Sequence, residues 1–241
     1  MSPSARAEAI LDRLPADTIG FAHVRNLAAA SAKIERVARI FQEVSPTSIP
    51  APLDMIKAAT GLGAGIDEQG DALLALLPGE QGAADPRLLL LVAISDYAAF
   101  AQSISGDATG EISRVTIAGE EVLAAKVGGF AALMNVEHRD ELESLIAAEP
   151  SKNAAGVEPL REWLATTDVA VVLTPSGLKA LADLGKSDAA RQRGLAAQTP
   201  QGLQSLQDML QFYEQMLQFL GAEVECIAAG LSIDDDANVK V

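Results

Sequence analysis

The chain has 241 residues with 49% hydrophobic and 4% aromatic side chains, and its formal net charge is −15 at pH 7. A chain this long and apolar can bury a sizeable core, which excludes a wholly disordered protein and fits one large domain or two small ones. The negative charge opposes a nucleic-acid backbone, and no stretch of the sequence is long and apolar enough to cross a membrane. We therefore expect neither nucleic acid as a partner nor a transmembrane segment.

The first part of the chain alternates β-rich apolar runs with helical patterns. Strands are predicted over about residues 18–24, 72–77, 87–94, 111–117, 121–126 and 130–135, and helices over about 27–41, 52–60, 96–104 and 137–148. Tight turns separate the last three strands and predict an antiparallel meander. The glycines of Gly61–Gly65 resemble a dinucleotide fingerprint, but they follow a helix and precede a strand. That order favours a helix C-cap with a connecting loop.

The stretch Asp168–Leu178 has the same design as Asp17–Leu27: an acid, a strand, a polar cap and a helix. Aligning Ile19 with Val169 and Phe21 with Val171 gives one constant offset of 150 residues. Further elements of the second part are predicted as helices over about 158–164, 175–184 and 200–220 and strands over about 224–233 and 238–241. The order strand, helix, helix, hairpin thus occurs twice, which indicates an internal duplication.

We predict a first α+β repeat in residues 1–150 and a second, incomplete α+β repeat in residues 151–241. The second copy lacks a counterpart of residues 96–148, so we expect either a partial duplication or, as the favoured interpretation, a longer native chain. The predicted fold class is α+β, built from duplicated strand-helix-helix-hairpin units with mainly antiparallel sheets covered by helices on one face.

No residue set in the sequence forms a catalytic, cofactor-binding or metal-binding constellation. The two histidines, His23 and His138, have no second ligand at metal-binding spacing, so we expect both to be structural. Cys226 is expected in the core of an apolar strand rather than as a nucleophile. The acids of Asp234–Asn238 alternate as in a calcium loop, but Val239 stands where such a loop needs glycine. A charged hairpin turn is the favoured interpretation.

The helix predicted from Pro200 to about Leu220 has two distinct sides. One side, the apolar stripe, consists of Leu203, Leu206, Met209, Leu210, Tyr213, Met216, Leu217 and Leu220, and the other, the glutamine stripe, of Gln204, Gln207, Gln211, Gln215 and Gln218. An uncharged polar stripe needs no charge desolvation on burial, so the glutamine stripe is a candidate partner-facing surface. The favoured interpretation is a helix packed on its own sheet with its glutamines in water, and the glutamine stripe is the surface to test first.

Four segments resemble a known group of sequences: Leu14–Thr18, Leu91–Phe100, Leu123–Asn135 and Asp168–Gly177. They are similar to uncharacterised planctomycete proteins with a DUF3352-type layout, and the resemblance covers most of the chain. Its motifs are structural patterns and carry no site residues. Relatives commonly begin with a secretion signal, which implies an extracytoplasmic protein. The first residues here lack the apolar core of such a signal, so the location is extracytoplasmic if a signal has been removed and otherwise cytoplasmic.

We therefore expect a non-enzymatic extracytoplasmic binding or assembly module. Its partner is an unidentified protein or small ligand, bound in the groove between the repeats or on the glutamine stripe. No cofactor is expected. Two alternatives stay open: a hydrolase-type enzyme with a scattered site at the repeat interface, and a homo-oligomer.

Overall fold

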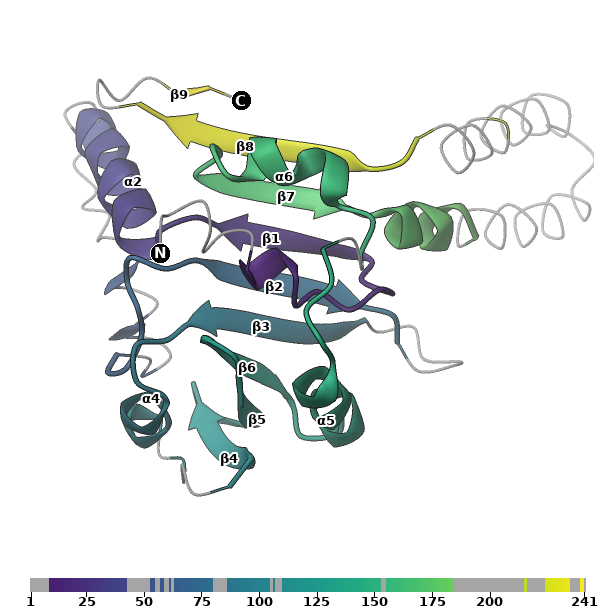
Figure 1. Cartoon of the computed structure of the whole chain (residues 1–241). Coiled ribbons are helices and arrows are strands. Elements are labelled where there is room, and N and C mark those ends of the chain that lie inside the picture. Colours follow the sequence, from purple (N-terminus) through teal and green to yellow (C-terminus); the bar gives the residue numbers. More distant parts are fainter. Residues whose placement is uncertain are drawn as a thin grey trace, which may run out of the picture.

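The chain folds as an α+β protein in which helices pack on an antiparallel sheet (Figure 1). The computed structural model describes residues 9–42, 53–54, 57–58, 61, 63–79, 86–104, 106, 110–152, 155–183, 215, 224–234 and 239–240. The predicted α+β class is therefore confirmed. No helix within these ranges is both long enough and apolar enough to span a membrane.

One sheet includes all nine strands of the described residues, in the order β4-β5-β6-β3-β2-β1-β7-β8-β9. Every neighbouring pair is antiparallel. The strands are β1 (Gly20–Val24), β2 (Ala72–Leu77), β3 (Arg87–Ala93), β4 (Ile112–Ile117), β5 (Glu120–Val127), β6 (Phe130–Asn135), β7 (Val169–Leu173), β8 (Ile227–Ile233) and β9 (Val239–Lys240). Each lies within or within a residue of a predicted strand, and β4, β5 and β6 form the predicted meander.

The helices also begin and end near the predicted positions. They are α2 (Leu27–Gln42), α4 (Tyr97–Ser103), α5 (Arg139–Ala147) and α6 (Arg161–Leu164), which the 3-10 turn η1 (Glu158–Leu160) precedes; residues 9–11 and 175–183 are helical as well. Asp96 caps α4, because its side chain accepts the N–H groups of Ala98 and Ala99. Gly61 has a positive φ of 74° and donates its N–H to the carbonyl of Lys57. This confirms the predicted helix C-cap.

The two faces of the sheet support separate core clusters. Leu91 packs in a cluster with Ile10 and Leu142, under residues 9–11 and α5. Its neighbour Val92 packs in the other cluster with Phe100 of α4. Because successive strand residues point to opposite faces, helices cover parts of both faces. The prediction of helices on one face was wrong, since the period of a single strand does not say which helix returns to which side.

The strands β1 and β7 lie side by side, so both predicted repeats contribute to one sheet. In the order β3-β2-β1-β7-β8-β9, β1 is followed outwards by β2 and β3, and β7 is followed outwards by β8 and β9. Two copies joined through their first strands would give this order. The duplication and its boundary stay a prediction. Its alignment needs correction, because Phe21 is 2% exposed whereas Val171, its partner at an offset of 150, is 57% exposed. Phe21 pairs with Val172, which places Val171 on the opposite face.

Candidate functional site

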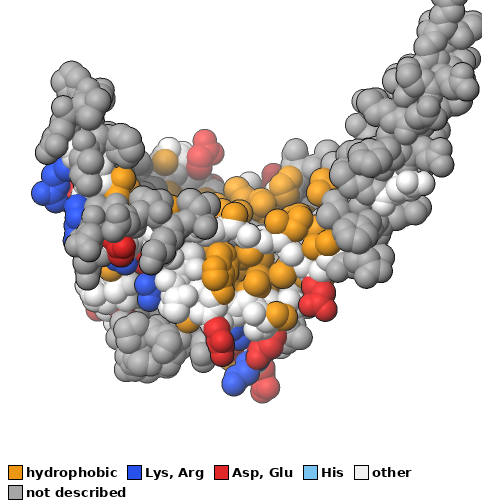
Figure 2. All heavy atoms as spheres, turned by 90° about the horizontal axis from the view of Figure 1, so that it is seen from above, with side chains coloured by type: hydrophobic (Ala, Val, Ile, Leu, Met, Phe, Trp, Pro, Cys, Tyr) orange, Lys and Arg blue, Asp and Glu red, His pale blue; other side chains and the backbone are white. Residues whose placement is uncertain are grey.

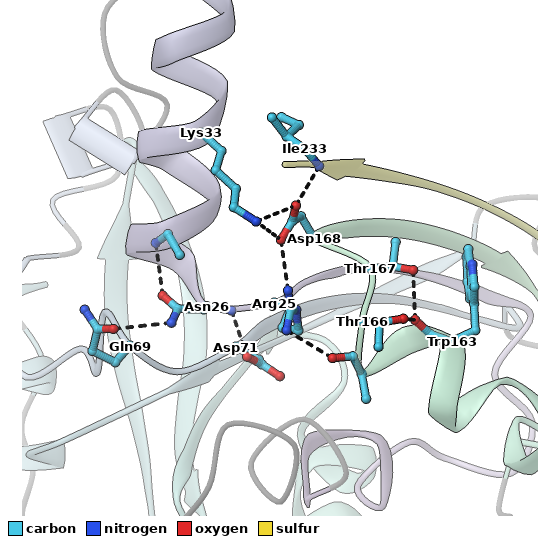
Figure 3. Close-up of polar contacts among 12 residues, drawn as sticks. Arg25, Asn26, Lys33, Gln69, Asp71, Trp163, Thr166, Thr167, Asp168 and Ile233 are labelled. Atoms are coloured by element: carbon cyan, nitrogen blue, oxygen red, sulfur yellow. Dashed lines mark hydrogen bonds and ion pairs between the residues drawn. The ribbon is translucent and has the colours of Figure 1, made fainter. Parts of the chain in front are cut away.

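A cluster of buried charges lies where β1, β7 and α2 meet (Figure 3). The antiparallel pairing of β1 with β7 brings Arg25, just after β1, beside Asp168, just before β7. The Arg25 N–H donates to the carbonyl of Asp168 at 2.9 Å. From α2, Lys33 contacts the side-chain carboxylate of Asp168, which is 4% exposed. The cluster therefore ties both predicted repeats together.

The carboxylate of Asp168 accepts four hydrogen bonds. Arg25 Nη2 donates to Oδ1 at 3.1 Å, and Lys33 Nζ donates to Oδ1 and Oδ2 at 2.9 and 3.0 Å. The backbone N–H of Ile233, at the end of β8, donates to Oδ2 at 2.9 Å. A carboxylate has about four acceptor positions, so none is left for a ligand.

The electrostatics agree with a structural role for Asp168. Burial alone would raise its pKa, but the N–H of Ile233 and the hydrogen bonds and charge of Lys33 and Arg25 outweigh burial and lower it. The carboxylate is therefore ionised at neutral pH and held by its partners.

A second buried pair, His23 and Asp71, lies on β1 and at the start of β2. His23 Nε2 is 3.2 Å from Asp71 Oδ2, and the side chains are 0% and 3% exposed. The other oxygen of Asp71 accepts the backbone N–H of Asn26 at 2.8 Å. His23 Nδ1 is buried and has no hydrogen-bond partner. With no nucleophile bonded to that nitrogen and no exposed surface, this pair lacks the contacts a hydrolytic dyad needs.

Sequence reasoning missed these roles. It assigned no role to Lys33, which binds a buried carboxylate 135 residues away. It did not single out Arg25 or Asp71. The one available signal was an acid shortly before an apolar strand, and that signal is ambiguous: Asp17 lies three residues before β1, and its side chain is 57% exposed.

A cavity of about 440 Å³ lies between the segment 12–17, α5 and the sheet. Its floor is apolar and consists of core side chains: Leu14, Leu77, Leu89, Met134 and Leu145. Except for Ser151, the residues that line it belong to the first predicted repeat. This cavity therefore does not lie in the groove that was expected between the two repeats.

The rim of the cavity is predominantly acidic. Its charged residues are Asp12, Asp17, Asp140, Glu141 and Glu149 against Arg13 and Arg87. Arg87 is held by Glu141, by Asp17 at 3.9 Å and by the carbonyl of Pro78.

Four charged residues of the rim remain, and the first of them, Asp12, forms an ion pair with Arg161 at 2.6 Å. Arg13 Nη1 donates to the carbonyl of Ala148 at 3.2 Å. Asp140 and Glu149 have no ion-pair partner among the described residues, and both are exposed. Their carboxylates are thus available to a ligand in the cavity.

The remaining sequence-predicted residues are not gathered into a site. Gln215 is helical and exposed, whereas Gln204, Gln207, Gln211 and Gln218 lie outside the described residues. His138 precedes α5, and the described part of the chain contains no group of three or more His, Cys, Asp or Glu placed to hold a metal. Of the alternating acids of Asp234–Asn238, only Asp234 lies within the described residues.

Cys226 requires a correction. It lies just before β8 rather than inside it, and it is half-buried. Burial and, second, the negative charge of Glu225 raise the pKa of its thiol. A raised pKa disfavours the thiolate, which is the nucleophilic form of cysteine.

Comparisons of the chain with protein-family models, with curated proteins and with solved structures find no match. The cavity, the buried charge cluster and the sheet itself are thus the observations on which a function can be argued.

Proposed function

We propose that the protein is a non-enzymatic binding module that holds a small amphipathic cation in the cavity beside α5. The observation that carries the proposal is the pairing of an apolar floor with an acidic rim in one cavity of about 440 Å³. Ligand sites are typically concave and mostly apolar, with a few polar groups that fix the orientation of the ligand. Pro15 and Leu145, which keep some exposed surface, offer apolar contact, and Asp140 and Glu149 offer charge.

The charge balance of the rim favours a cation over an anion. Asp17 and Glu141 hold Arg87, and Asp12 is paired with Arg161 at 2.6 Å. Asp140 and Glu149 then remain against Arg13, so the rim keeps a net negative charge. The net charge of −15 for the whole chain adds a field of the same sign. A ligand with an alkyl body and an ammonium or guanidinium end fits both parts of the cavity.

Catalysis has no observation in its favour among the described residues. The buried carboxylate of Asp168 has no free acceptor position, and His23 has no exposed surface. We keep an extracytoplasmic location within the proposal; it rests on the resemblance to DUF3352-type sequences, and cell fractionation with an antibody against the protein would test it.

The test is an NMR titration with two probes of equal length, octylammonium and octanoate. We expect octylammonium to bind and octanoate not to bind. Asp140→Asn and Glu149→Gln should each weaken binding of octylammonium roughly threefold, as exposed ion pairs contribute up to about 1 kcal/mol.

A bulky side chain separates cavity binding from adsorption to the surface. Ser144 lines the cavity from α5, so Ser144→Trp should abolish binding. Gln102→Trp, at an exposed position of α4, is the matched control and should leave binding unchanged. Binding of octanoate in place of octylammonium, or equal binding by both tryptophan variants, would overturn the proposal.

A further inference from the structure

One face of the sheet carries two adjacent rows of side chains without a polar residue. The strand registers align Leu88, Leu76, Gly20, Leu173 and Ile227 in the first row and Leu90, Leu74, Ala22, Val171 and Ala229 in the second. We call these ten positions the apolar sheet face. They span β3, β2, β1, β7 and β8, far from the cavity rim on α5.

The apolar side chains of this face are exposed to solvent, whereas most large apolar side chains of a folded protein are buried. Leu88, Val171 and Ile227 are 51%, 57% and 45% exposed, and Leu74 and Leu76 are 41% and 37% exposed. Figure 2, seen from above, shows hydrophobic side chains gathered in the middle of the view, with charged side chains towards the periphery. An exposed apolar patch of this kind indicates a surface that something covers.

The same face is covered at its other end. The next row along the strands includes Ala72 and Val92, which pack in the core cluster with Leu27 of α2 and Phe100 of α4. The connection that leaves β1 thus helps to bury the end of the sheet at which it emerges. The exposed rows lie at the opposite end, where β7 ends and β8 begins.

The chain leaves and returns at this exposed end. Leu173, the last residue of β7, is paired directly with Ile227, the first residue of β8, and both belong to the apolar sheet face. Residues 174–226 connect them. Within that connection lies the predicted helix of residues 200–220, for whose apolar stripe the sequence predicts packing on a sheet but not which strands it covers. Because both ends of the connection are anchored beside the face, its local concentration there is high.

We infer that the apolar stripe of residues 203–220 packs on the apolar sheet face and leaves the glutamine stripe towards solvent. The sizes agree: with strands about 4.8 Å apart and a two-residue step of about 6.8 Å, ten positions cover roughly 300 Å². A helix of 18 residues is about 27 Å long and about 10 Å across, which is a similar footprint. Gln215, a member of the glutamine stripe, is helical, as the predicted helix requires.

Photo-crosslinking tests the inference in the full chain. With p-benzoylphenylalanine in place of Val171, irradiation should join position 171 to residues 203–220 of the same molecule, as mapped by mass spectrometry. The matched control carries the same group in place of Thr116, an exposed residue of β4 on the opposite face, and should give no such product. A crosslinked dimer would assign the face to a second copy, and the absence of any protein crosslink would show an open face; either result overturns the inference.

Charge variants supply an independent readout. Leu206→Glu with Leu217→Glu places two charges in the apolar stripe and should abolish the crosslink from position 171. Gln207→Glu with Gln218→Glu adds the same charge on the neighbouring residues of the glutamine stripe and should preserve it. Far-UV circular dichroism confirms that each variant is folded, and loss of the crosslink in both variants would contradict the assignment of the two stripes. This inference does not depend on ligand binding in the cavity.

Discussion

Replacing Asp168 by asparagine should strongly destabilise the fold. The substitution removes the charge that Lys33 and Arg25 share, and the new amide N–H₂ must face a donor that previously bonded to the carboxylate. Removing one partner of a buried ion pair costs about 3–5 kcal/mol. The lower end applies here, because Lys33 and Arg25 are 22% and 26% exposed and water can reach them.

The expected loss is therefore about 3 kcal/mol at pH 7, which lowers the Tm of a domain of this size by about 6–12 °C. Urea unfolding followed by circular dichroism measures it. Asp17→Asn is the matched control: Asp17 also lies shortly before a central strand, but it is 57% exposed and 3.9 Å from its cation. It should cost less than about 0.5 kcal/mol.

The effect of Asp168→Asn should also depend on pH. The folded protein lowers the pKa of Asp168. A group with a lowered pKa stabilises the fold above its ordinary pKa, about 3.9, and this stabilisation is lost as the pH falls through the folded-state value. The difference between wild type and variant should thus be full at pH 7 and shrink below about pH 4. Equal stability losses for the two asparagine variants, or a difference that does not change with pH, would refute the reasoning.

Two further predictions concern the second part of the chain. Gly177→Ala should cost about 2–3 kcal/mol, because an added Cβ would lie 1.9 Å from the carbonyl oxygen of Ile19, whereas Gly129→Ala, with nothing within 4 Å, should cost less than about 1 kcal/mol; thermal unfolding compares them. Iodoacetamide should alkylate Cys226 more slowly than free cysteine at pH 7.5, and Glu225→Gln should speed the reaction by removing a charge that raises the thiol pKa.

The local elements were predictable because each is encoded within a short window of sequence. The strands β2 and β3 are apolar runs with turn-forming residues at their ends. Thr174 caps the helix at 175–183 by accepting the N–H of Gly177, as its position before Pro175 predicts. These features need no knowledge of distant residues, and they gave the fold class correctly.

Features that depend on distant contacts were not predictable. In the sheet, β3 pairs with β6, although β4 and β5 lie between them in the sequence. Nothing in either strand encodes that choice of partner. The role of Lys33 required knowing that a carboxylate 135 residues away is buried beside α2. The one-residue error in the repeat alignment has the same origin, since period-2 side-chain alternation changes face with a single-residue slip.

The candidate site was beyond sequence reasoning for the same reason. The cavity combines the segment 12–17 with β2, β3, β6 and α5, and its residues are spread from Asp12 to Ser151. Asp140 and Glu141 are neighbours in the sequence, but nothing in the sequence shows that they face a cavity. Asp140 and Glu149 become a pair only because α5 runs along the cavity.

The most direct measurement is a crystal structure of the protein with octylammonium. The account predicts an alkyl chain against Pro15 and Leu145 and an ammonium nitrogen within ion-pair distance of Asp140 or Glu149. An alkyl chain bound elsewhere, or an empty cavity at a probe concentration that saturates the NMR titration, would contradict it.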